Sequence, residues 1–163
     1  HNPDAIAALV AGVGNMPAQR RSVVISGAGD RRDEDIREQT RILGAAFDSV
    51  ILYQDACQRG RADGEVLSLL RQGLEGATRA RQVEEIHGEF TAIDRALEQL
   101  QAGDLCLILI DQVQEALAHI QRRVDEARPA TAKPGRVPAG KTPARVKKPG
   151  SDATATSLAA RAA

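Results

Sequence analysis

The chain has 163 residues with 22 basic and 22 acidic side chains, so its formal net charge is zero. This zero hides two segments of opposite sign, because eight basic residues and one acid follow Ala127, which leaves 14 basic and 21 acidic residues before that point. No apolar run approaches the roughly 20 residues of a membrane span and no signal peptide is visible, so we expect no membrane partner.

Apolar residues recur at helical spacing in some segments and form short runs in others, which predicts alternating helices and strands. In chain order, the predicted elements are a helix over 3–13, a strand over 23–25, a helix over 33–47, a strand over 50–53, a helix over 66–74, a strand over 83–86, a helix over 91–100, a strand over 105–110 and a helix over 113–124. This order predicts an α/β fold, a Rossmann-like and mainly parallel sheet with helices on both faces.

Local residue types predict where these elements begin and where the strands lie. Asp33 and Asp63 are suitable helix N-caps, and Thr91 opens a pattern like a capping box. Because residues 83–86 include two glutamates, we expect that strand near an edge of the sheet. The run LCLILI over 105–110 has no polar face, which predicts a central strand covered on both sides.

The C-terminal segment differs in composition from the rest of the chain. Residues 127–163 hold all four lysines and five of the seven prolines, and large apolar residues are nearly absent. Such a segment cannot offset the chain entropy lost on folding, so we predict one domain over residues 1–126 and a disordered basic tail, rich in Pro, Ala and Lys, over 127–163. The tail could touch a polyanion, but it lacks the aromatic residues that stack on bases, so a flexible terminus is preferred to nucleic acid binding.

The cysteines and histidines carry little functional signal. Cys57 lies in a polar loop and Cys106 in an apolar strand, so we expect no disulfide and a cytoplasmic location. His87 and His119 have no partners at metal-ligand spacing, so no metal site is predicted. The chain opens on His1 with a helix almost at once, which favours an origin within a longer protein.

Charged loops follow the predicted strands at the place where α/β sheets bind ligands, beyond the strands' carboxyl ends. The loops expected to share one rim are Gly27–Arg32, Gln54–Gly64, Gly88–Thr91 and the segment at Asp111. The first of them lies in GAGDRRDEDI, which matches neither the G-x-G-x-x-G fingerprint nor a phosphate loop. Asp30 could orient a cationic or metal-bound group, and Arg31 and Arg32 could clamp a phosphate or carboxylate. The alternative is a solvated turn.

The second rim loop, QDACQRGRADGE over 54–65, mixes both charges. Arg59 and Arg61 suit a carboxylate, whereas acids such as Glu65 suit an amine or guanidinium, so together they fit a zwitterionic amino acid. The alternative is a mobile charged loop. Asn2 raises a similar choice, since it could hydrogen-bond a ribose or base, or simply cap the first helix.

Three segments together resemble the C-terminal domain of Mur ligases, and most closely that of the cyanophycin synthetase type. HNPDAIAAL resembles the family's linker into the first helix, VISGAGDRRDEDIRE resembles a GDRRDEDI-like stretch, and LYQDACQRGRADGEVLSLL resembles an RGR-x-x-GE segment. GDLCLILIDQV is similar to the final strand. The resemblance covers about residues 1 to 125, in the same order.

The resemblance implies an ATP-dependent ligase that forms an amide through an acyl phosphate, with arginine joined to the aspartate side chains of a poly-aspartate backbone. It implies ATP and Mg held mainly by a central ATPase domain that lies outside this chain, and a homo-oligomer in the full enzyme. By itself the fragment is expected to be inactive, because it has no phosphate loop.

Carried over by position, Asn2 would lie near the nucleotide, and Asp30 and Arg31 would face the reacting phosphate and substrate. The amino-acid pocket would be lined by Arg32, Arg59, Arg61 and Glu65. Two alternatives stay open. One is another Mur or folylpolyglutamate-type ligase with a different amine, and the other is a non-catalytic module that binds a nucleotide or a polyanion.

Overall fold

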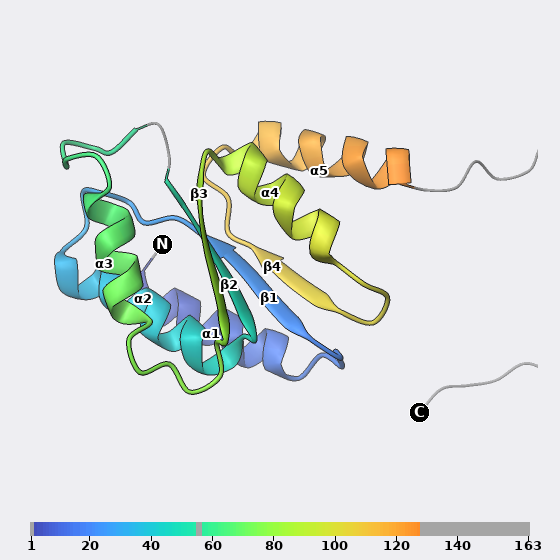
Figure 1. Ribbon diagram of the computed structural model, residues 1–163, viewed down its shortest axis with the longest axis horizontal. Helices are drawn as coiled ribbons and strands as arrows, with labels where there is room; N and C mark the ends of the chain where they lie inside the picture. The colour runs from blue at the N-terminus through green and yellow to red at the C-terminus, as the bar shows by residue number, and fades with distance from the viewer. Residues whose placement is uncertain (1, 55–56, 128–163) are drawn as a thin grey trace, which may run out of the picture. The chain divides into compact units, whose positions relative to one another are not determined.

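The computed structural model describes residues 2–54 and 57–127, which form a parallel α/β domain (Figure 1). In chain order the elements are α1 (Pro3–Gly14), β1 (Arg21–Ile25), α2 (Asp33–Ala46), β2 (Ser49–Gln54), α3 (Glu65–Gly73), β3 (Gln82–His87), α4 (Glu89–Gln99), β4 (Leu105–Ile108) and α5 (Val113–Ala127). The predicted fold class is confirmed. The predicted tail lies outside the described residues from position 128 onward, and no described helix is long and apolar enough to cross a membrane.

The four strands form one sheet in the order β3-β2-β1-β4. All three pairings are parallel, with Val23 opposite Val50 on one side of β1 and opposite Leu107 on the other. The carboxyl ends of the strands therefore meet at one edge of the domain, as the sequence predicts. This edge, called the rim below, consists of the loops that follow β1, β2, β3 and β4.

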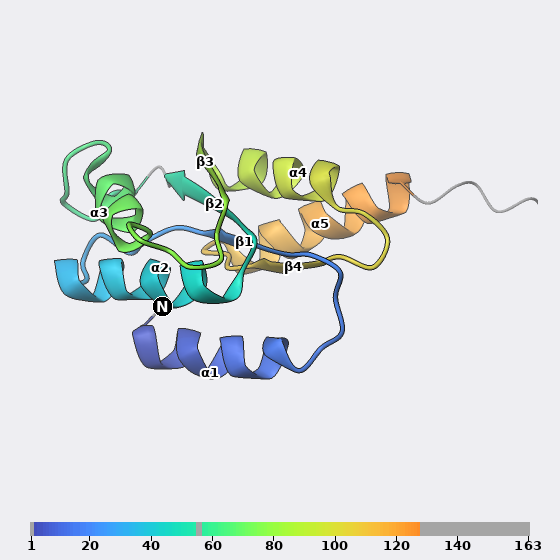
Figure 2. The ribbon, with the colours of Figure 1, turned by 60° about the horizontal axis from the view of Figure 1, so that its bottom comes forward.

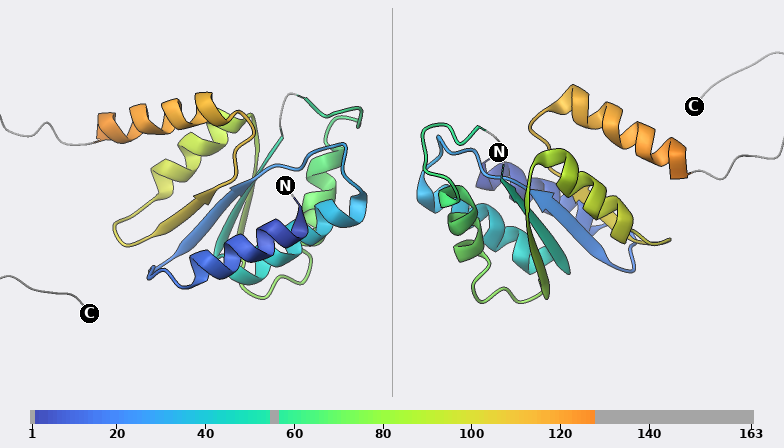
Figure 3. Two further views of the ribbon diagram at one scale, coloured as in Figure 1. Left: turned by 180° about the vertical axis from the view of Figure 1, so that it is seen from behind. Right: turned by 45° about the horizontal axis from the view of Figure 1, so that its top comes forward.

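Helices cover both faces of the sheet. Figures 2 and 3 show α1 and α2 on one side and α4 and α5 on the other. The strands alternate their side chains accordingly: Val23 and Ile25 join the core cluster that includes α1, α2 and α3, whereas Val24 joins the cluster that includes Ala92 and Ala96 of α4. Because successive side chains of a strand point to opposite faces, the three consecutive apolar residues Val23, Val24 and Ile25 serve both core clusters.

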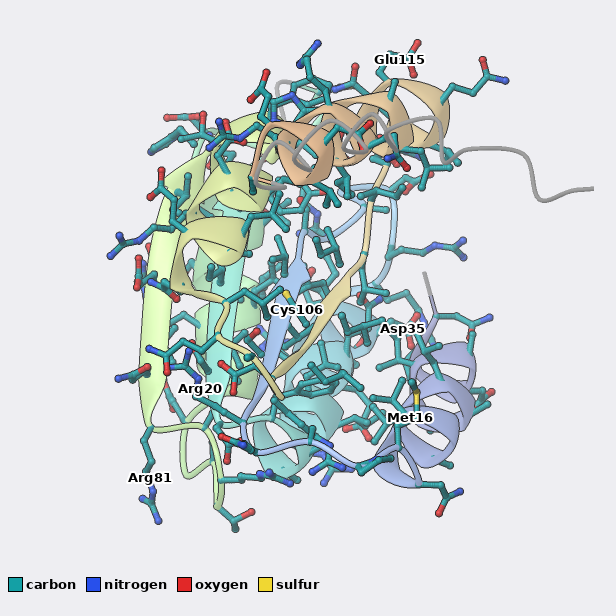
Figure 4. All side chains as sticks on the ribbon, turned by 90° about the vertical axis from the view of Figure 1, so that its right-hand side faces the viewer. Met16, Arg20, Asp35, Arg81, Cys106 and Glu115 are labelled. Atoms are coloured by element: carbon teal, nitrogen blue, oxygen red, sulfur yellow. The ribbon has the colours of Figure 1, made fainter. Side chains whose placement is uncertain are left out.

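The prediction of a central strand at residues 105–110 is wrong. β4 lies at an edge of the sheet and ends at Ile108, and all four of its residues are only half-buried. Figure 4 looks onto this edge, with Cys106 in front. Leu105 packs on one core cluster and Cys106 on the other, so both faces of the strand are apolar although one lateral side has no neighbouring strand among the described residues. An apolar run indicates that both faces of a strand are covered, but it does not indicate whether the strand has a neighbour on each lateral side.

Strand β3 lies at the other edge, as its acidic residues predict. Cys57 and Cys106 are both free, which agrees with the expectation that they form no disulfide. His119 donates a hydrogen bond from Nε2 to the carboxylate of Asp94 at 2.8 Å, across the contact between α4 and α5. This contact gives the histidine a structural role between the two helices.

The predicted helix caps differ from those in the structure. α2 begins at the predicted Asp33, but Arg32 and not Asp33 is its N-cap. α3 begins after Gly64, whose φ of 77° suits glycine, and α4 begins at Glu89 instead of Thr91. None of these three N-cap residues caps its helix with a side-chain hydrogen bond.

Candidate functional site

The loops after β1 and β2 lie side by side at the rim (Figures 1 and 2), and Gly29 of the first loop approaches the main chain of Gln58 in the second. A Cβ atom built on Gly29 would lie 2.1 Å from the carbonyl oxygen of Gln58, which no real side chain tolerates. Glycine at position 29 therefore permits the two charged loops to share one surface.

Arg61 joins these two loops with nearly all of its hydrogen-bond donors. Its Nε donates to the carbonyl oxygen of Gly29 at 2.7 Å, and one terminal nitrogen donates to the carbonyl oxygen of Arg31 at 2.7 Å. The guanidinium also pairs with Glu65 at 2.6 Å and with Asp33 at 2.8 Å. Only 17% of the Arg61 side chain is exposed. Because its donors reach both loops, Arg61 holds the two rim loops together.

The ion pairs of Arg61 shift the titration of its partner. The hydrogen bond from Arg61 lowers the pKa of Glu65, and the main-chain N–H of Ala62 lowers it further. The carboxylates of Glu65 and Asp33 raise the pKa of Arg61 in turn. Glu65 and Arg61 are therefore charged at neutral pH, and the contacts of Arg61 leave little of its guanidinium for a ligand.

Arg59 is the more available arginine of the RGR segment. It has a φ of 50°, a left-handed conformation that is uncommon outside glycine. Its terminal nitrogens lie 3.4 Å from Asp30 and 3.5 Å from Asp111, so it stands between two acids that come from different loops. These contacts are long, and 42% of the side chain is exposed, which leaves the guanidinium free to exchange them for a ligand.

A small hollow opens beneath Arg59. Its volume is about 10 Å³, and its lining comprises Ser26, Gly27, Ala28, Tyr53, Cys57, Arg59 and Asp111. A space of this size holds about one water molecule. The hollow marks the centre of the rim, where the ends of β1 and β2 and the loop after β4 converge.

The two arginines of the first rim loop, Arg31 and Arg32, differ in how available their side chains are to a ligand. Arg32 makes a two-pronged pair with Asp35 of its own helix, at 2.9 and 2.8 Å, and this pair raises the pKa of Arg32. Arg31 is exposed, and its main-chain carbonyl is the one that Arg61 holds. Arg31 is therefore the better placed of the two to meet an incoming anion.

Asn2 stands apart from this cluster. Its side-chain oxygen accepts the N–H of Ala5 at 2.7 Å, which is an N-cap for α1. Among residues 2–54 and 57–127, no hydrogen bond or ion pair joins Asn2 to the rim residues. The structure thus brings together Asp30, Arg31, Arg59, Arg61 and Glu65, turns Arg32 toward its own helix, and gives Asn2 a capping contact.

Two residues that hold the rim were missed as site residues. The side chain of Gln54 at the end of β2 accepts the N–H of Gly64 at 2.9 Å and donates to Asp63, which fixes the entry to α3. Glu89 at the start of α4 is 2% exposed and binds the main chain of the loop after β4. A glutamine at a strand end and an acid after glycine were visible in the sequence, but their burial was not.

The charge distribution at the rim limits where a phosphate could bind. The N-terminus of α2 points its positive dipole end at the rim, but its first turn carries three acids, Asp33, Glu34 and Asp35. An anion would therefore meet repulsion there, and Arg31 is the group that fits it. The described residues contain no cluster of three or more His, Cys, Asp or Glu side chains that could hold a metal ion.

A parallel α/β sheet with convergent charged loops at its carboxyl edge defines the class of ligand-binding α/β domains. Comparison with known families is more specific. The family model described as "Mur ligase, glutamate ligase domain" matches residues 1–109, so the chain belongs to the Mur ligase family. The family expected from the sequence motifs is confirmed.

Two curated relatives show how much of a whole ligase this chain represents. The cyanophycin synthetase of Crocosphaera subtropica is 36% identical over 123 residues, which is 76% of this chain and 14% of that protein. The UDP-N-acetylmuramoyl-L-alanyl-D-glutamate--2,6-diaminopimelate ligase of Chlorobaculum tepidum is 36% identical over 110 residues, which is 66% of this chain and 21% of that protein. The chain therefore spans about a seventh to a fifth of the length of these relatives.

A solved structure of a ligase with the latter name has a TM-score of 0.62 to this chain. The sequence identity is 24%, and the match covers 76% of this chain and 28% of that chain. This similarity shows a shared fold.

Proposed function

We propose that this chain is the C-terminal domain of an ATP-dependent amide ligase of the cyanophycin synthetase type. Such an enzyme would join arginine to the aspartate side chains of a poly-aspartate backbone through an acyl phosphate. The cyanophycin synthetases of five organisms, 32–36% identical to this chain, support the choice of type. We further propose that the whole enzyme is cytoplasmic and homo-oligomeric.

The observation that carries the proposal is the charged cluster at the rim. Asp30 and Arg31 come from one loop, Arg59 and Arg61 come from the next, and Arg61 ties the two loops together. Guanidinium groups suit the carboxylate of an incoming amino acid, and the neighbouring acids suit its amine or guanidinium. A solvated turn would not need a half-buried arginine that hydrogen-bonds to two loops.

Each residue receives a role from its position. Asp30 and Arg31 would face the reacting phosphate and carboxylate, while Arg59 and Glu65 would bound the amino-acid pocket. Arg61 lines the same pocket and holds its wall in place. Arg32 would contact the substrate only after breaking its ion pair with Asp35. Asn2 would contact the nucleotide only after breaking its capping hydrogen bond to Ala5.

ATP would supply the phosphoryl group that activates the aspartate carboxylate, and a central ATPase domain would hold most of the nucleotide and the Mg. This chain's residues would close over that domain, exclude water from the activated carboxylate and orient the attacking amine. A domain with this role needs no nucleophile and base of its own.

The experiment uses a longer protein that joins this domain to the ATP-binding domain of the same enzyme. It is offered ATP and a poly-aspartate primer with arginine, lysine or glutamate, and ADP release and polymer mass are measured. We expect ADP release and a mass increase with arginine. Turnover with glutamate alone would favour a folylpolyglutamate-type ligase, and no turnover with any amine would favour a non-catalytic module that binds a nucleotide or polyanion.

The isolated chain of 163 residues provides a second check. It has no phosphate loop, so we expect it to release no ADP from ATP. Measurable ATP turnover by this fragment would contradict the assignment of the chemistry to two domains.

A further inference from the structure

Glu89 is a buried carboxylate whose role is not explained by its own helix. It is the first residue of α4, it follows Gly88 with a φ of 91°, and only 2% of it is exposed. Burying a carboxylate is costly unless hydrogen bonds replace its water. The positive end of the α4 dipole supplies part of this compensation, and the rest comes from another loop.

The compensating bonds come from the two residues that precede α5. One carboxylate oxygen of Glu89 accepts the main-chain N–H of Asp111 at 2.8 Å. The other accepts the main-chain N–H of Gln112 at 3.2 Å and the side-chain amide of the same residue at 3.3 Å. A single side chain thus holds two consecutive main-chain amides of the loop after β4.

The hydrogen bonds of Glu89 to this loop help to position Asp111 at the rim. Asp111 lines the hollow at the centre of the rim, and its carboxylate lies 3.5 Å from Arg59. The same loop is held at a second point, because Tyr53 donates its hydroxyl to the carbonyl oxygen of Leu109 at 3.2 Å. The main chain is therefore held at Leu109, Asp111 and Gln112, which places the carboxylate of Asp111 beside Arg59.

We propose that Glu89 is a positioning residue of the rim site, which sets Asp111 so that it can receive the cationic side chain of the incoming amino acid. The inference rests on the function proposed above and extends it to a second loop. Glu89 touches no substrate and acts through Asp111. Because Asp30 and Arg31 lie on a different loop, losing Glu89 affects affinity for the amine more than turnover.

The kinetic test replaces Glu89 with glutamine in the longer protein. Glu89→Gln keeps the shape of the side chain but replaces one accepting carboxylate oxygen with a donating NH₂ group, so the loop loses an acceptor for its N–H groups. The KM for arginine should rise about tenfold while kcat and the KM for ATP change less than about twofold. Glu89→Asp, which keeps the carboxylate, should recover part of the affinity. The matched control is Glu98→Gln on the exposed side of the same helix, which should behave as wild type.

A double variant shows whether Glu89 works through Asp111. Asp111→Asn alone should raise the KM for arginine to a similar extent, and adding Glu89→Gln should raise it little further. Fully additive effects would overturn the proposal. So would a fall in kcat with an unchanged KM for arginine.

Amide hydrogen exchange on the 163-residue chain separates failure of this proposal from failure of the proposed function. Glu89→Gln should speed exchange at the amides of Asp111 and Gln112 about tenfold, with the amides of β1 unchanged. Unchanged exchange overturns the positioning role whatever the substrate is. If exchange is faster in Glu89→Gln but the wild-type longer protein does not use arginine, the positioning role stands and only the choice of amine is overturned.

Discussion

At the scale of single residues, the rim depends on contacts between side chains and main-chain oxygens. Arg61 bonds to the carbonyl groups of Gly29 and Arg31 as well as to two carboxylates. A guanidinium can reach several acceptors at once because its donors are arranged in a fixed planar fork. Lysine carries one compact ammonium group and cannot span them.

Arg61→Lys should therefore loosen both rim loops. In the longer protein we expect amide formation to fall by a factor of about 100, because the groups that face the reaction lose their alignment. Arg41→Lys is the matched control, since Arg41 is 69% exposed and pairs only with Glu38 of its own helix among the described residues. An amide-forming rate within about twofold of wild type in Arg61→Lys would contradict the bracing role.

Gly29 tests the contact between the same loops by sterics alone. Gly29→Ala places a methyl group 2.1 Å from the carbonyl oxygen of Gln58, so the loops must separate. We expect a loss of about 1–3 kcal/mol in the free energy of unfolding, measured by urea denaturation. Gly12→Ala, in the interior of α1 with nothing within 4 Å, should instead gain up to about 1 kcal/mol.

The sequence predicted which residues would meet at the rim but not what each would do there. Parallel strands bring the loops after them to one edge, so Asp30 and Arg59 could be placed together from element order alone. The pairing of Arg61 with main-chain oxygens depends on loop conformation, which element order does not specify. The self-pairing of Arg32 with Asp35 could have been predicted, because residues three apart on a helix are neighbours.

At the scale of elements, α2 contains a polar group in the wrong surroundings. Gln39 is fully buried, and both polar atoms of its amide have no hydrogen-bond partner among the described residues. An unsatisfied buried polar group costs about 1–3 kcal/mol.

Gln39→Met should therefore stabilise the chain. Methionine has nearly the same shape as glutamine and no donor or acceptor to satisfy, so we expect the free energy of unfolding to rise by about 1 kcal/mol. Gln121→Met on the exposed face of α5 is the control and should change stability by less than about 0.5 kcal/mol. A loss of stability in Gln39→Met would show that the buried amide is satisfied.

Asp48 joins the starts of several strands at the end of the sheet opposite the rim. It accepts the main-chain N–H of Arg21 at 2.8 Å and a two-pronged pair from Arg79 at 2.8 and 3.0 Å. The hydrogen bond from Arg79, and then that from the main chain of Arg21, lowers the pKa of Asp48 although partial burial opposes this. The folded state therefore holds this carboxylate ionised to a lower pH than the unfolded chain does.

The sign of the pH dependence follows from this shift. Above the ordinary aspartate pKa of about 4, the contribution of Asp48 to stability is complete, and it is lost as the pH falls through the lower pKa of the folded state. Asp48→Asn should lose up to about 1 kcal/mol at pH 7, because the pair is a third exposed, and should differ less from wild type at pH 3. A difference between the two proteins that grows toward pH 3 would contradict this account.

The elements also show where hydrophobic pattern is a reliable guide. Alternating helices and strands predicted the parallel sheet, and the glutamates of β3 predicted an edge. The same reasoning failed for β4, because both of its faces pack on core clusters while one lateral side has no neighbouring strand among residues 2–54 and 57–127. Pattern along a strand measures what lies above and below it, whereas position within the sheet depends on crossovers that the pattern does not encode.

At the scale of the whole molecule, this chain is one part of a ligase family whose members are several times longer. Asp30 and Arg59 of the rim are about half exposed in the described domain, and Glu115 of α5 projects away from the fold (Figure 4). The central claim is that the rim completes a reaction centre built together with another domain. Only a protein that contains both parts can test that claim directly.

The most direct measurement is the rate of arginine-dependent amide formation by Asp30→Ala in such a protein, at saturating ATP. Asp30 is exposed, and its pairing with Arg59 is long, so its removal should leave the free energy of unfolding nearly unchanged. We predict a rate about 100-fold below wild type, with Glu115→Ala equal to wild type. A wild-type rate in Asp30→Ala would show that the rim takes no part in the reaction.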